Sequence, residues 1–224
     1  MDKLLLWMFV FTSLLSEAFC QTDLKRKVFV FPRESETDHV KLIPHLEKPL
    51  QNFTLCFRTY SDLSRSQSLF SYSVKGRDNE LLIYKEKVGE YSLYIGQSKV
   101  TVRGMEEYLS PVHLCTTWES SSGIVEFWVN GKPWVKKSLQ REYTVKAPPS
   151  IVLGQEQDNY GGGFQRSQSF VGEFSDLYMW DYVLTPQDIL FVYRDSPVNP
   201  NILNWQALNY EINGYVVIRP RVWD

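Results

Sequence analysis

The segment Ile124–Gly131 (IVEFWVNG) indicates the fold class most directly. Apolar and aromatic residues dominate Ile124–Val129, as in a β-strand. Asn130-Gly131 follows, and both of these residues accept the positive φ that a two-residue hairpin turn requires. Pro133–Val135 then starts the return of the chain. We therefore predict a β-hairpin in this region.

Similar strand-like runs lie on both sides of this hairpin. Each is short, rich in β-branched or aromatic residues and closed by turn residues. Aromatic residues make up 15% of the chain, which favours a sheet-rich protein over a helical bundle. The predicted strands are Lys27–Phe31, Phe53–Arg58, Ser68–Val74, Leu81–Tyr84, Glu90–Ile95, Val112–Trp118, Ile151–Leu153, Ser169–Val171 and Tyr215–Ile218, with a polar turn at Lys75–Glu80. This spacing predicts an all-β sandwich or jelly roll.

One segment has the pattern of a helix instead. Thr185 can cap its start, Pro186 suits the first helical position and Asp188 the third. Asp195–Pro197 would end it. Its apolar face would consist of Ile189, Leu190, Val192 and Tyr193. We expect this helix to pack on the outside of a sheet.

The first twenty residues have the pattern of a secretory signal peptide. Lys3 precedes the apolar run Leu4–Leu15, which is too short to span a membrane. Ala18 and Cys20 have the spacing of a signal-peptidase site. We predict a signal peptide over residues 1–20 and a secreted, extracellular mature domain over residues 21–224.

The mature chain has almost balanced charge. The leader contains Asp2, Glu17 and Lys3, so residues 21–224 keep 24 acidic and 23 basic side chains, with a net charge near −1. This balance gives no general basic surface for nucleic acid. No later segment reaches membrane-spanning length, and about two hundred residues suit one large β domain.

Two covalent modifications are predicted for the mature chain. Cys56 and Cys115 remain after Cys20 leaves with the leader, and an even pair in an exported protein indicates a disulfide. Two buried free thiols are the alternative. Asn52-Phe53-Thr54 is an N-glycosylation sequon. In its alternative interpretation, Asn52 is inaccessible in the folding strand.

One loop between two predicted strands is rich in oxygen ligands. Glu156 and Asp158 are two residues apart, so in extended chain they project to the same side, while the Gln157 side chain points away. Such close carboxylates repel unless a cation or proton lies between them, and Ca²⁺ takes six to eight oxygens. Gly161–Gly163 allow the loop to fold back and bring Gln168 to the same site. A solvated acidic loop is the alternative.

Other residues that could bind metal give weaker patterns. Asp78-Asn79 is a common turn dipeptide and matters for a metal only if the fold brings it to Glu156. His39, His45 and His113 are too scattered for a zinc motif. We expect His113 to be a satisfied structural histidine.

Catalytic patterns are also weak. Glycoside hydrolysis needs two facing carboxyl groups. Glu173 and Asp176 are three residues apart, so a regular strand would place them on opposite faces. We find no nucleophile elbow and no phosphate-binding glycine loop, and we predict that the protein is not an enzyme.

The segment His113–Ser120 (HLCTTWES) matches the pentraxin signature H-x-C-x-S/T-W-x-S/T. Other segments that resemble pentraxins are Phe29–Ser35, Gly76–Leu82, Leu153–Asp158 and Asn204–Glu211. The chain therefore resembles the pentraxin family over essentially its whole mature length. The resemblance implies a two-sheet, lectin-like jelly roll with one long surface helix and a Cys56–Cys115 disulfide. It also implies a homopentameric ring, with a decamer as the alternative.

The resemblance further implies two Ca²⁺ ions per subunit. The first ion would be held by Asp78, Asn79, Glu156, the carbonyl of Gln157, and Asp158. The second ion would share Glu156 and Asp158 and add Gln168. Gln165 stands where relatives can carry an acid, and this predicts a weaker second site, because an amide supplies less charge.

Ligands of the family complete the calcium coordination through a phosphate or carboxylate. The resemblance assigns ligand contacts to Asn79 and Gln168, and an apolar pocket to Leu82, Tyr84 and Tyr94. Packing on the sheet surface is the alternative role of the tyrosines. Lys99 replaces an acid of the phosphocholine-binding branch and would repel a quaternary ammonium. Phosphoethanolamine-like and acidic-sugar ligands are therefore expected over phosphocholine.

The resemblance implies a calcium-dependent pattern-recognition lectin of the plasma, acting in innate immunity and the acute phase. Its expected ligands are amyloid fibrils, chromatin or DNA, microbial polysaccharides and apoptotic surfaces, and its expected protein partners are complement C1q and Fcγ receptors. A phosphocholine-binding pentraxin is the main alternative. A structural or carrier glycoprotein without calcium-dependent binding is a more distant one.

Overall fold

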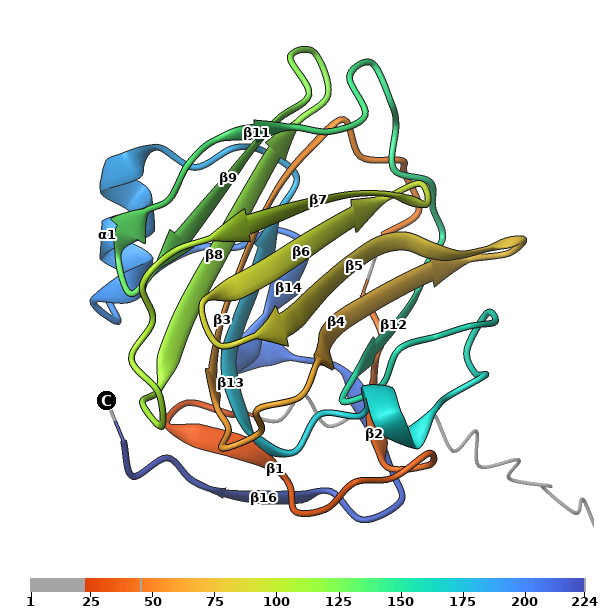
Figure 1. Cartoon of the computed structure of the whole chain (residues 1–224), viewed down its shortest axis with the longest axis vertical. Helices are drawn as coiled ribbons and strands as arrows, with labels where there is room; N and C mark the ends of the chain where they lie inside the picture. The colour runs from red at the N-terminus through yellow and green to blue at the C-terminus, as the bar shows by residue number, and fades with distance from the viewer. Residues whose placement is uncertain (1–22, 45, 224) are drawn as a thin grey trace, which may run out of the picture.

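The protein is described here by a computed structural model that covers residues 23–44 and 46–223. Two antiparallel β-sheets pack face to face, with one α-helix on the outside (Figure 1). The predicted signal peptide, Cys20 and His45 lie outside the described residues. Within the described ranges, no helix is long and apolar enough to cross a membrane. The prediction of a two-sheet jelly roll with one helix is confirmed.

The larger sheet contains nine strands. Seven of them follow the order β10-β9-β8-β3-β13-β1-β16, while β11 pairs with β9 and β14 with β13. The bounds are β1 Lys27–Phe31, β3 Asn52–Tyr60, β8 Val112–Glu119, β9 Ile124–Val129, β10 Lys132–Pro133, β11 Lys137–Ser138, β13 Gly172–Trp180, β14 Leu203–Asn204 and β16 Val217–Pro220.

The second sheet contains seven strands in the order β15-β2-β12-β4-β5-β6-β7. Their bounds are β2 His39–Leu42, β4 Gln67–Val74, β5 Arg77–Lys87, β6 Glu90–Ile95, β7 Ser98–Arg103, β12 Ser150–Leu153 and β15 Tyr210–Asn213. The β4–β5 hairpin and the loop that follows β12 lie at the same side of the molecule, on the right in Figure 1.

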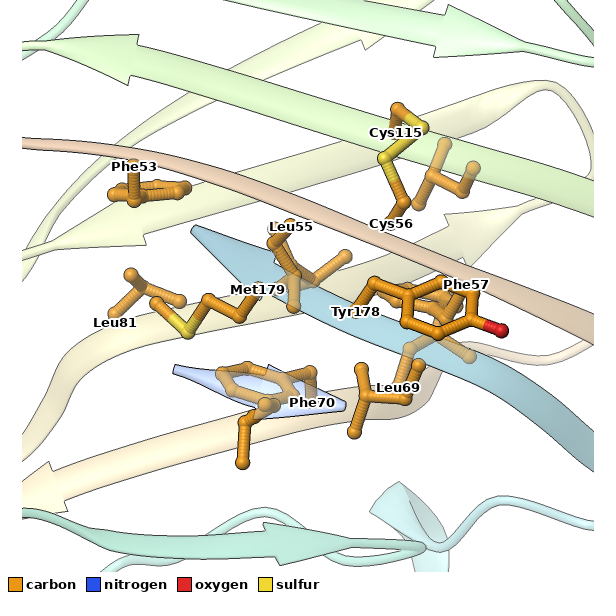
Figure 2. Packing of buried hydrophobic residues seen from close by; sticks show 14 of the residues in the cluster. Phe53, Leu55, Cys56, Phe57, Leu69, Phe70, Leu81, Cys115, Tyr178 and Met179 are labelled. Atoms are coloured by element: carbon orange, nitrogen blue, oxygen red, sulfur yellow. A yellow bond between two sulfur atoms is a disulfide. The ribbon is translucent and has the colours of Figure 1, made fainter. Parts of the chain in front are cut away.

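The main core lies between the sheets. Phe53, Leu55 and Phe57 alternate along β3 and are fully buried, as are Phe70 and Leu81 of the opposite sheet (Figure 2). Each such side chain contributes about 1.5–3 kcal/mol on burial. A disulfide joins Cys56 of β3 to Cys115 of β8, which are directly opposite in register. This is the pairing that the family resemblance implied.

The helix α1, Pro186–Tyr193, covers the outer face of the nine-stranded sheet. Thr185 accepts a hydrogen bond from the backbone N–H of Asp188 (3.2 Å), which forms the predicted cap. The Arg58 guanidinium of β3 donates to the carbonyl of Tyr193 at the helix end. β3 and β8 are buried along most of their length, with the core on one side and α1 with its preceding loop on the other. Two 3₁₀ turns, η1 Arg166–Gln168 and η2 Trp205–Ala207, complete the helical elements among the described residues.

The predicted hairpin after β9 is confirmed, with Asn130 and Gly131 at φ 50° and 73°. Two other predictions are wrong. Residues 77–80, predicted as part of a turn, begin β5 because the Glu80 carboxylate finds hydrogen-bond donors inside the protein. The predicted strand Ser169–Val171 is irregular, because the Ser169 N–H bonds back to Arg166 at the end of η1.

The sequence pattern also missed or misplaced some short strands and edge strands. β7 is largely exposed and polar, and β2 and β15 have only four residues each. The last strand was predicted at Tyr215–Ile218 and lies at Val217–Pro220. Short or polar edge strands carry little of the apolar alternation on which a sequence prediction depends.

Candidate metal and ligand site

The loop after β12 folds back on itself, as its glycines predicted. Gly161 and Gly163 have φ of 78° and 77°, a region that strongly favours glycine. Asn159 and Gly162 exchange two backbone hydrogen bonds at the loop tip, of 3.1 and 3.0 Å. The short turn η1 then brings Gln168 back to Glu156, to which its amide donates a hydrogen bond.

The side chain of Gln157 points away from the carboxylates, as predicted. Its amide nitrogen donates to the carbonyls of Ser71 and Ser150, at 3.0 Å each. Its amide oxygen accepts from the Ser73 hydroxyl and the Gly161 N–H, at 2.9 Å each. These bonds hold the base of the loop against β4. Because they occupy both polar atoms of the Gln157 side chain, the backbone carbonyl is the oxygen of this residue that remains to coordinate an ion.

Glu156 lies at the centre of the site and is only 7% exposed. Its carboxylate accepts hydrogen bonds from the amides of Asn79 (3.2 Å) and Gln168, so the structure brings three of the predicted residues together. Burial raises the pKa of Glu156 to about 7, against the opposing effect of the Asn79 hydrogen bond. The negative charges of Asp158 and Asp78 raise this pKa further. An added cation would relieve both the burial cost and the repulsion.

Two amide oxygens at this site also lack partners. Asn79 Oδ1 and Gln168 Oε1 are buried and have no hydrogen-bond partner within the described residues. A buried polar atom left in this way costs about 1–3 kcal/mol. Each belongs to an amide whose nitrogen faces Glu156, so a half-turn of that amide would present its oxygen there instead. The donor set fits a hard cation such as Ca²⁺, which prefers carboxylate and amide oxygens.

Two further glutamines reach the remaining carboxylates. Gln165 donates to Asp158 Oδ2 at 2.6 Å, which places this neutral residue beside the predicted second ion. Gln97 lies 3.5 Å from Asp78 Oδ1. Sequence reasoning missed Gln97, which belongs to the turn between β6 and β7. In the part of the chain that the structure describes, no lysine or arginine forms an ion pair with Asp78, Glu156 or Asp158.

The predicted ligand pocket forms a patch on the outer face of the seven-stranded sheet. Leu82 of β5 lies directly opposite Tyr94 of β6, and Tyr84 is two residues further along β5 on the same face. Burial raises the pKa of Tyr84, and the nearby charge of Glu156 contributes to this rise. Tyr84 is only 8% exposed, whereas Tyr94 is half-buried. The patch therefore borders the carboxylates, with Tyr94 as its more accessible aromatic ring.

Lys99 lies at the edge of this patch, next to Tyr94. Its ammonium donates to the Tyr94 hydroxyl (3.2 Å) and to Glu86 Oε1 (3.3 Å). Glu86 was missed from the sequence, although its position two residues after Tyr84 places it on the same face of β5. Because Glu86 pairs with Lys99, the patch carries less net positive charge than Lys99 alone would give.

The structure also tests the other clusters. Cys56, His113 and Cys115 lie within 4.8 Å of one another, but both cysteines are in the disulfide and offer no thiolate. Burial and the charge of Arg58 lower the pKa of His113 to about 3. Its Nδ1 has no partner among the described residues, so the expectation of a fully satisfied histidine is wrong.

Glu173 and Asp176 do not lie on a regular strand, as the sequence argument assumed. A bulge interrupts the pairing of β13 between Ser175 and Tyr178, and Asp176 has a φ of 51°. Each acid nevertheless has its own partner. Glu173 accepts from the Trp223 ring N–H (2.5 Å), and Asp176 pairs with Arg221.

Residues 27–220 match the Pentaxin family, also spelled pentraxin. The chain belongs to this family. It is 81% identical over 224 residues to serum amyloid P-component of Rattus norvegicus, covering all of this chain and 98% of the relative. It is 52% identical over 225 residues to human C-reactive protein, covering the whole of both chains. The resemblance drawn from the signature is therefore confirmed, with greater similarity to this P-component than to this C-reactive protein.

A solved pentraxin has the same fold. The heptameric pentraxin of Limulus polyphemus, which resembles serum amyloid P-component, superposes with a TM-score of 0.78 at 24% identity. The match covers 88% of this chain and 96% of the other. At this sequence identity, the comparison supports only the jelly-roll fold.

Proposed function

We propose that this pentraxin is a secreted, calcium-dependent pattern-recognition lectin. The observation that carries the proposal is the buried Glu156 carboxylate, which faces two amides whose oxygens lack partners. The proposed ligands of the first ion are Asp78, Asn79, Glu156, the Gln157 carbonyl and Asp158. The proposed second ion shares Glu156 and Asp158 and adds Gln168.

Bound calcium would supply the positive charge that attracts a phosphate or carboxylate. The residues of the chain then select the rest of the ligand. Leu82, Tyr84 and Tyr94 would pack against its organic part and exclude water from that side. Asn79 and Gln168 would contact the anionic group beside the ions.

We propose phosphoethanolamine-type and acidic-sugar ligands for this pocket. A primary ammonium can donate hydrogen bonds to the Tyr94 hydroxyl or to Glu86, whereas a trimethylammonium has no N–H to donate. Lys99 repels either cation at this edge, but only the primary ammonium can offset this repulsion with such hydrogen bonds. A phosphocholine preference, as in the C-reactive-protein-like alternative, would show as tighter binding of phosphocholine in calorimetry with calcium. We expect phosphoethanolamine to bind more tightly than phosphocholine, and we expect Lys99→Glu to narrow the difference in affinity between these two ligands.

Two complementary surfaces support assembly into a ring. The strip Lys132–Lys137 (KPWVKK), at the β10 end of the nine-stranded sheet, carries exposed lysines around Val135, which is 69% exposed. An apolar groove of about 300 Å³ lies near β1, toward the other end of this sheet. Its lining includes the rings of Phe31 and Tyr60 and the acids Asp62 and Glu173. The strip of one copy fits the groove of the next in apolar character and charge. Contacts between two different surfaces can close into a ring.

We propose that this ring is a homopentamer, with a decamer as the alternative. Asp62→Lys should cancel the net negative charge of the groove, because only Glu173 then remains as an acid there, and should shift the protein toward monomer in sedimentation velocity. An unchanged sedimentation coefficient would contradict the proposed contact. Several copies of one weak site on one ring would supply avidity for repetitive targets.

The proposed macromolecular targets are amyloid fibrils, chromatin or DNA, and microbial surfaces, with complement C1q and Fcγ receptors as protein partners. They are supported by similarity to serum amyloid P-component. We also propose N-glycosylation at Asn52, which is half-buried at the start of β3. Treatment of the secreted protein with a peptide N-glycosidase should lower its mass and convert Asn52 to aspartate.

Calcium titration calorimetry tests the metal site. Wild-type protein should bind two ions per subunit, and Glu156→Gln should weaken both, because both share this carboxylate. Glu107→Gln is the matched control, since Glu107 is an exposed acid in the segment after β7. Equal calcium binding by wild type and Glu156→Gln would refute the proposal.

A further inference from the structure

Residues 139–146, which we call the strap, support one half of the proposed site without supplying a calcium ligand. The strap connects β11 of the nine-stranded sheet to the chain that leads into β12 of the seven-stranded sheet. It is fixed to the turn between β8 and β9, where Leu139 N–H donates to Gly123 (2.8 Å) and Glu142 N–H to Ser120 (2.7 Å). Gln140 and Glu142 adopt φ of 50° and 62°, which is uncommon for residues with a side chain. The strap is therefore held in a specific conformation.

Tyr143 of the strap holds the carboxylate of Glu80 on β5. Its hydroxyl lies 2.9 Å from each Glu80 oxygen, and the Lys146 N–H donates to the same carboxylate at 2.6 Å. Arg77 lies 3.5 Å from Glu80 and also donates to the Tyr143 hydroxyl. Glu80 is 0% exposed, and a buried charge of this kind is tolerated only when it is well paired. Burial and Glu80 raise the pKa of Tyr143 to about 12, so its hydroxyl remains a donor.

Glu80 is adjacent to Asn79, the proposed calcium ligand. The turn between β6 and β7 holds the same backbone, because Gly96 N–H donates to the Glu80 carbonyl (3.1 Å) and Gln97 N–H to the Asn79 carbonyl (3.2 Å). The Tyr143 ring lies against Gly96, where an added Cβ would lie only 2.7 Å from a ring carbon. The strap, the start of β5 and the β6–β7 turn therefore meet directly behind Asp78 and Asn79.

We propose that Tyr143 and Glu80 are positioning residues for the calcium site. They hold the backbone of Asp78 and Asn79 so that both side chains face Glu156 before an ion binds. Calcium affinity then depends on hydrogen bonds between groups that do not touch the ion. This inference rests on the proposed function and deepens it.

Tyr143→Phe tests the proposal, because it removes the hydroxyl and keeps the ring against Gly96. Chymotryptic cleavage of the 156–168 loop is followed over a calcium titration. The calcium concentration for half-maximal protection should rise about tenfold, as is typical when an outer partner of a metal ligand is lost. Tyr178→Phe is the control, since this buried tyrosine lies on β13 of the other sheet. It should leave the calcium dependence unchanged.

The melting temperature in EDTA separates positioning from simple stabilisation. A purely structural role for Tyr143 would lower this temperature and leave the calcium concentration for protection at the wild-type value, and that result would overturn the proposal. Arg77→Gln is a second variant at a partly exposed side chain, in case Tyr143→Phe does not fold. It should raise the required calcium severalfold, and wild-type dependence would likewise overturn the proposal. Absence of calcium-dependent protection in the wild type would instead refute the proposed function.

Discussion

Replacing Glu156 by glutamine should make the calcium-free protein more stable. The pKa of this carboxyl rises from its ordinary value of 4.5 to about 7 in the folded protein. Since each pKa unit corresponds to 1.36 kcal/mol, the charged form destabilises the fold by ~3 kcal/mol at alkaline pH. Glutamine has nearly the same shape and no charge, and its amide can donate to the unpartnered oxygen of Asn79 or Gln168. We expect Glu156→Gln to gain about 2–3 kcal/mol at pH 8.

The pH dependence of this gain follows from the same values. The folded pKa lies above the unfolded one, so the penalty is complete above pH 7 and declines as the pH falls from 7 toward 4.5. The advantage of Glu156→Gln over the wild type should therefore be largest at pH 8 and small at pH 5. The difference in unfolding free energy between the two proteins removes the contribution of groups that titrate equally in both.

Urea denaturation in EDTA, at one fixed protein concentration, measures this difference. Glu107→Gln serves as the control, because removal of an exposed charge should change the unfolding free energy by less than about 0.5 kcal/mol. Calcium should stabilise the wild type and have little effect on Glu156→Gln. If Glu156→Gln is no more stable than the wild type at pH 8, then the electrostatic description of the site is wrong.

Three further predictions concern the loop, the second ion and acid stability. Removal of calcium should accelerate chymotryptic cleavage within residues 156–168, because the carboxylates then repel; equal rates with and without EDTA would contradict this. Gln165→Glu should tighten the weaker calcium site in calorimetry by adding charge beside Asp158, and an unchanged second affinity would show that Gln165 does not face that ion. The pKa of His113 falls from 6.5 to about 3 on folding, so its contribution to stability is complete above pH 6.5 and should fall by up to about 5 kcal/mol as the pH approaches 3. His113→Gln should flatten this part of the urea-derived stability profile, and a profile that stays as steep would assign the acid sensitivity to other groups.

Features that depend on neighbouring residues were predictable from the sequence. The hairpin at Asn130-Gly131 follows from the φ preferences of two adjacent residues. The orientation of the Gln157 side chain, away from the two carboxylates and into the protein, follows from its place between Glu156 and Asp158. The return of Gln168 to Glu156 was predicted from the glycines of the loop. In each case the chain geometry that decides the outcome lies within about a dozen residues, although the Gln157 side chain is then held by the distant Ser71.

Features that depend on distant partners were not predictable in this way. Glu80 belongs to a strand because Tyr143, 63 positions later, supplies a donor for its carboxylate. Glu86 became part of the ligand patch only when β5, β6 and β7 brought Lys99 beside it. The unpartnered oxygens of Asn79 and Gln168, which carry the argument for a cation, exist only in the folded arrangement.

Retention on phosphoethanolamine resin tests the central claim most directly. Wild-type protein should bind to the resin in calcium and elute with EDTA. The Glu156→Gln variant should lose most of this retention, while Glu107→Gln should bind as the wild type does. Retention that is unaffected by both EDTA and Glu156→Gln, or no retention of the wild type in calcium, would contradict a calcium-dependent lectin function.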